Sequence, residues 1–121
     1  MALKVSGYSS TALTYKTVEQ GTVTQTADVD VLGTSGTLYS LDLDNQHSST
    51  VYIKFFLSAG EYTAGTSEPD LMFRIAASTS RKLDIPGGLP FSQLTFWAND
   101  GPNTSDTDAP GGTVVVIAVC S

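Results

Sequence analysis

The chain has 121 residues, of which 40% are hydrophobic and 15% charged, and its net charge is −6. This is the length of a single domain that can bury a hydrophobic core. The densest basic cluster is Arg81-Lys82, which argues against nucleic-acid binding because phosphate backbones are held by many clustered cations. No apolar stretch approaches the ~20 residues of a transmembrane helix, and Met1–Tyr8 lacks the pattern of a secretion signal, so we expect no membrane association.

Residues 1–27 interleave Thr, Ser and Gln with isolated apolar residues, and few of them could build a core. Two interpretations remain open for this segment: an N-terminal arm, or an edge strand of the domain that follows. As an arm, it would attach to a partner or add a strand to the partner's sheet, and deleting residues 1–20 would leave the domain folded. Its expected contact residues are Leu3, Val5, Tyr8, Leu13 and Tyr15.

From residue 28 onward, apolar residues recur with a period of two, beginning at Val29 and Val31, and this pattern predicts half-buried strands. The expected core residues are Leu41, Val51, Ile53, Phe55, Phe73, Ile75, Leu94, Phe96 and Val116. Pro86-Gly87-Gly88 is expected to end the strand that carries Leu83 and Ile85. Strands at intervals of roughly 10–15 residues, separated by Gly- and Ser-rich turns, favour antiparallel pairing. We therefore predict an all-β fold, with one antiparallel β-sandwich of jelly-roll or Ig-like type over residues 28–121.

The residues that could carry chemistry are few and scattered. His47, the single histidine, lies in a polar turn, and Cys120 lies on an apolar strand with no second histidine to activate it. Asp42 and Asp44 share one strand face beside a turn, which would suit calcium but is also ordinary at strand ends. The acidic loop over residues 100–108 is expected to be flexible and solvated. We expect no catalytic residues, no cofactor and no metal, so the chain is not expected to be an enzyme.

Large side chains also occur on the strand faces that the predicted core does not use. They are Tyr52, Phe56, Met72 and Trp97. Monomers rarely expose broad apolar patches, so this pattern predicts contacts with a partner or with identical copies.

Four segments resemble a family of small virion proteins of tailed bacteriophages, including cyanophages, and among these most closely the capsid cement or decoration proteins. They are Gly36–Asn45 (GTLYSLDLDN), Val51–Phe56 (VYIKFF), Ala64–Leu71 (AGTSEPDL) and Ile85–Ser92 (IPGGLPFS). The resemblance covers about two thirds of the chain. Because its motifs are turns and strands, it carries information on fold and virion location rather than on catalysis.

The resemblance implies a virion structural protein, assembled in the host cytoplasm, that binds the major capsid protein on the capsid exterior and stabilises the shell. Many proteins of this kind are trimers, so a homotrimer is expected. The alternative is a module of a phage fibre or capsid that binds host-surface carbohydrate. In that case Tyr52, Tyr62 and Trp97 would stack on sugar rings.

Overall fold

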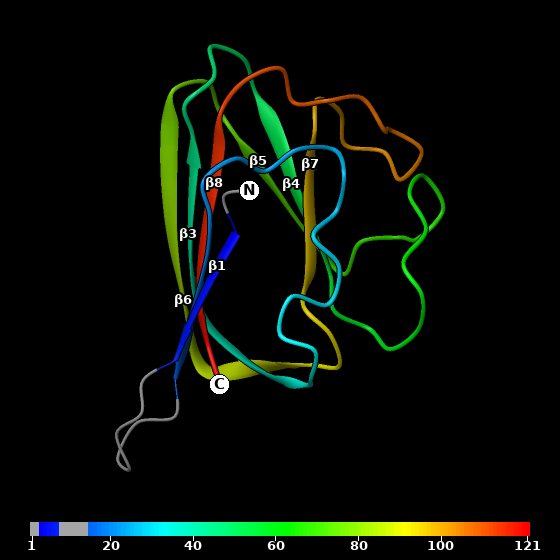
Figure 1. The fold of residues 1–121 in the computed structure, drawn as a ribbon. Helices are drawn as coiled ribbons and strands as arrows, with labels where there is room; N and C mark the ends of the chain where they lie inside the picture. The colour runs from blue at the N-terminus through cyan, green and yellow to red at the C-terminus, as the bar shows by residue number, and fades with distance from the viewer. Residues whose placement is uncertain (1–2, 8–14) are drawn as a thin grey trace.

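The computed structural model describes residues 3–7 and 15–121. These residues form eight strands and no helix, in two antiparallel sheets that face each other (Figure 1). The predicted all-β sandwich is confirmed. The strands are β1 (Leu3–Gly7), β2 (Lys16–Gln20), β3 (Gly36–Asn45), β4 (Val51–Phe56), β5 (Leu71–Ile75), β6 (Thr79–Phe91), β7 (Thr95–Asn99) and β8 (Val114–Cys120). Within the described ranges, no helix is long and apolar enough to cross a membrane.

The two sheets differ in width. One has five strands in the order β1-β2-β8-β3-β6, and the other has three in the order β5-β4-β7. The predicted core fills the space between them because alternate side chains of each strand point to the same side. All nine predicted core residues are buried except Phe73, which is partly buried against the others. Phe55 packs against both Phe73 and Phe96, with ring centroids 5.9 and 5.8 Å apart.

Two strands from residues 1–27, β1 and β2, belong to the five-stranded sheet and do not form a detached arm. β2 pairs with β8, and β1 pairs with β2 as the edge strand. Val18 is fully buried, so deleting residues 1–20 would remove part of the core, which argues against the prediction that the domain stays folded after this deletion. Of the expected arm contacts, Leu3 packs against the core, whereas Val5 and Tyr15 are 44% and 39% exposed. Tyr8 and Leu13 lie outside the described residues.

Residues 21–32 run along the outer edge of β7 and close that side of the sandwich. Asp28 exchanges two backbone hydrogen bonds with Phe96, and Val31 N donates to Leu94 O at 2.9 Å. Val23 is buried, and Val31 packs against the core. The strand expected around Val29 is therefore only an isolated bridge at Asp28, and Val29 itself is 54% exposed.

β6 continues through Pro86-Gly87-Gly88 and does not end there as expected. The strand bulges: Leu38 faces Leu89 and Ser40 faces Asp84, so four residues of β6 lie between these pairs where β3 has one. Gly88 has φ +78°, and a Cβ there would lie 2.2 Å from Thr37 Cγ2. Only glycine fits this position. The bulge lets β6 resume its pairing with β3 and bury Phe91 at the end of the sandwich.

Candidate partner-binding surface

The outer face of the three-stranded sheet is covered by two loops of the chain itself, over residues 57–70 and 100–113 (Figure 1). Tyr62, from the first loop, lies on Trp97 with ring centroids 4.4 Å apart and also contacts Phe56 at 6.0 Å. Trp97 is only 4% exposed. The prediction that Trp97 contacts a partner is wrong, because Tyr62 from a loop distant in sequence covers this side chain. For the same reason, Trp97 is not accessible for stacking on a sugar ring.

The other three residues of that prediction remain at least partly accessible. Tyr52 and Phe56 are half-buried, and Met72 is 42% exposed on β5. The expected broad apolar patch is therefore reduced to the part of the outer face along β5.

A buried lysine fastens the second loop to this outer face. Lys54 is fully buried, and its Nζ donates to Asn99 Oδ1 at 3.1 Å and to Asn103 O at 2.8 Å. Burial lowers the pKa of Lys54, and the nearby carboxylates of Asp106 and Asp100 partly oppose that shift. Because water and ligands do not reach the amine, this lysine can hold the loop but cannot act as a nucleophile.

The acidic loop is folded back on itself through its own hydrogen bonds, and most of residues 100–108 are exposed to solvent, as expected. Asn103 N donates to Asp106 Oδ2 at 2.7 Å, and Asn99 Nδ2 donates to Asp108 O at 3.0 Å. Pro110 is buried. The loop is a cover for the sheet, and its carboxylates lie where they partly balance the buried Lys54 ammonium.

The opposite side of the sandwich is open, because β5 and β6 pair with only one neighbour each among the described strands. Between them runs a groove with two adjoining parts, of about 460 and 260 Å³, which we call the β5–β6 groove. Both parts include Leu71 and Leu89. The smaller part is lined mainly by apolar side chains, namely Leu41, Leu71, Phe73, Leu83, Ile85 and Leu89 beside Asp84.

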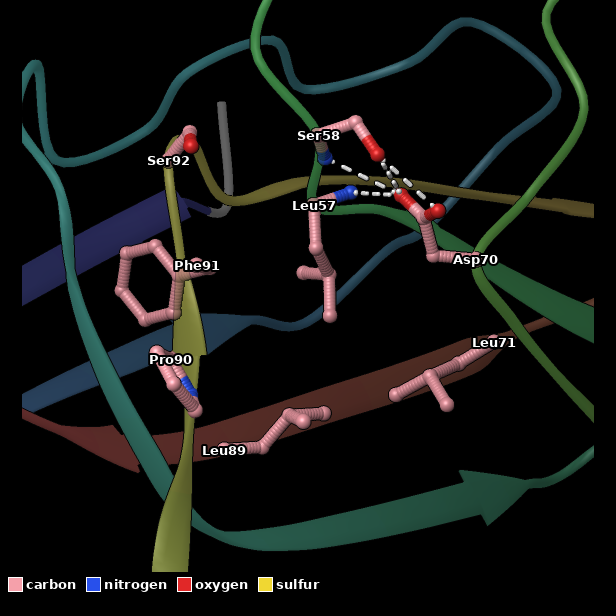
Figure 2. Close-up of a pocket in the computed structure, with 8 residues that line it drawn as sticks. All are labelled: Leu57, Ser58, Asp70, Leu71, Leu89, Pro90, Phe91 and Ser92. Atoms are coloured by element: carbon pink, nitrogen blue, oxygen red, sulfur yellow. Dashed lines mark hydrogen bonds between the residues drawn. The ribbon is translucent and has the colours of Figure 1, made fainter.

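Figure 2 shows the larger part of the groove, where Leu57, Leu71 and Leu89 project toward a common space. Asp70 lies at its rim, and Asp70 Oδ2 accepts hydrogen bonds from Leu57 N at 2.6 Å and from Ser58 N at 3.0 Å. Ser58 Oγ donates to the same carboxylate at 3.0 Å. The carboxylate therefore holds the start of the 57–70 loop and is not aimed into the groove as an acid or base.

The remaining predicted residues lie apart from one another. His47 is half-buried against Gly111 and Gly112, and burial raises the pKa of the Cys120 thiol, which is fully buried. Asp44 accepts a hydrogen bond from Gln46 Nε2 at 2.9 Å, and Asp42 lies 4.0 Å from Lys82 Nζ. Across residues 3–7 and 15–121, no three His, Cys, Asp or Glu side chains come together as a metal site would require.

The sequence did not predict the groove, nor did it predict that two loops cover the outer face of the three-stranded sheet. A groove forms beside the edge strands of a sheet, and a local sequence pattern does not show which strands lie at the edges. Two signals could have predicted the loop contacts. Lys54 interrupts a strand whose other face is fully apolar, and Asp70 follows a proline directly before a strand, a common place for a capping carboxylate.

No protein-family model matches the chain, and no curated protein matches it significantly.

Proposed function

We propose that this chain is a virion structural protein, a capsid cement or decoration protein that binds the outer surface of a phage capsid and reinforces it. The proposal starts from the resemblance of four strand and turn segments to that family. The observation that best supports an attachment role is the open, apolar β5–β6 groove, because an accessible apolar recess of this kind suits binding to another protein. Among the described residues, no group of His, Cys, Asp or Glu side chains is arranged to hold a metal ion.

In this role, each copy would bury a modest area at a junction between capsid subunits. Opening the shell would then require breaking these added contacts, and several copies held together would multiply weak single contacts. The sandwich suits the task as a rigid body, because its core is closed by residues 21–32 on one side and by the bulged end of β6 at another. We place it on the capsid exterior, with the major capsid protein as its partner.

The test is to compare particles that carry the protein with particles that lack it, under heating and osmotic shock. Loss of the protein should lower the temperature at which DNA is released, and adding purified protein back should restore it. Quantitative mass spectrometry should find hundreds of copies per particle. Equal stability with and without the protein would overturn the cement role.

The assembly state is part of the proposal, with a homotrimer as the expected form. Icosahedral shells offer threefold junctions between capsomers, where a closed trimer can touch several subunits at once. Of the residues that suggested self-association, Met72 remains exposed, whereas Trp97 is buried within the chain. Light scattering at neutral pH tests this point, and a monomer mass would argue against it.

The alternative is a glycan-binding module. Its aromatic platform would have to use Tyr52 and Tyr62, which are half-buried, without Trp97. Selective and competable binding in a glycan screen, together with a few dozen copies per particle or fewer, would favour this alternative.

A further inference from the structure

We draw no further inference here: the strongest candidate, the β5–β6 groove beside the free edge of β5, carries none because nothing in the structure shows what covers it.

Discussion

The Lys54 ammonium donates to Asn99 Oδ1 at 3.1 Å beneath the 100–113 loop. The same oxygen accepts the indole N–H of Trp97 at 3.0 Å. One side-chain amide therefore satisfies two buried donors on neighbouring strands, and its own Nδ2 holds the loop through Asp108 O. Asn99 thus joins β4, β7 and the 100–113 loop on the outer face of the three-stranded sheet.

Replacing Asn99 by Ala should lower the free energy of unfolding by about 2–3 kcal/mol, because the Trp97 indole N–H loses its acceptor and the buried Lys54 ammonium loses one of its two acceptors. Urea denaturation measures this change. Asn103→Ala is the matched control, since Asn103 accepts the Lys54 hydrogen bond through its backbone carbonyl, which the substitution keeps. The control should cost less than about 0.5 kcal/mol. Similar losses in both variants would contradict the role of the Asn99 side chain.

The free energy of unfolding should change at alkaline pH, because burial shifts the pKa of Cys120, Tyr62 and Lys54. Burial raises the pKa of Cys120 above its ordinary 9.0 and that of Tyr62 above 10.0, so the unfolded chain loses these protons first. Their contributions are full below those values and are lost as pH rises through the folded-state pKa of each group. We expect the urea midpoint to fall above about pH 9, and Cys120→Ala to remove the earliest part of that fall.

Lys54 acts in the opposite direction. Its pKa is below the ordinary 10.5, so the folded chain loses this proton before the unfolded chain does, and its contribution to stability rises as pH approaches 10.5. A Lys54→Met variant should therefore lose stability more steeply with pH than the parent chain. An equal or shallower slope would contradict this assignment.

The bulge of β6 should tolerate substitution at one glycine better than at its neighbour. Gly87→Ala should cost about 1–2 kcal/mol, because φ is +80° but nothing lies within 4 Å of the added Cβ. Gly88→Ala should cost at least about 3 kcal/mol, because the same strain is joined by a clash with Thr37 and Tyr39. Thermal unfolding of the pair gives the comparison, and equal costs would show that the close contacts at Gly88 relax freely.

Two valine substitutions test whether the N-terminal strands contribute to the stability of the folded domain. Val18→Ala removes buried methyl groups from the core and should cost about 2 kcal/mol. Val5→Ala, on the edge strand and 44% exposed, should cost less than about 1 kcal/mol. Denaturant unfolding measures both, and a negligible effect at Val18 would mean that β2 contributes nothing to the core.

Asp70→Ala should loosen the start of the 57–70 loop, because the amides of Leu57 and Ser58 lose their charged acceptor. Hydrogen exchange at these two amides should become about tenfold faster, while exchange in β3 and β8 stays unchanged. Glu68→Ala serves as the control, since Glu68 is exposed and makes no hydrogen bond to the described residues. Unchanged exchange in the Asp70 variant would show that other contacts hold the loop.

The period-two pattern of apolar residues was enough to predict the all-β sandwich, and the expected core residues are buried except Phe73, which is partly buried. In a strand, successive side chains point to opposite faces, so the spacing of Ile53 and Phe55 by two residues is enough to predict that both are buried on the same face. The same rule placed Trp97 correctly on the face opposite Phe96. It could not show that this face is covered, because the cover is Tyr62, which belongs to a loop between two other strands.

What only the tertiary structure decided is which edges and faces stay open. Val18 is a core residue in a polar, Thr-rich segment, and its burial depends on pairing with β8 at the other end of the chain. The β5–β6 groove likewise arises because a three-stranded sheet faces a wider, five-stranded one. Residues 21–32 cover the wider sheet only on the β7 side, and the β5 side stays open. Local patterns describe each strand by itself, whereas exposure depends on the path that the connecting segments take between strands.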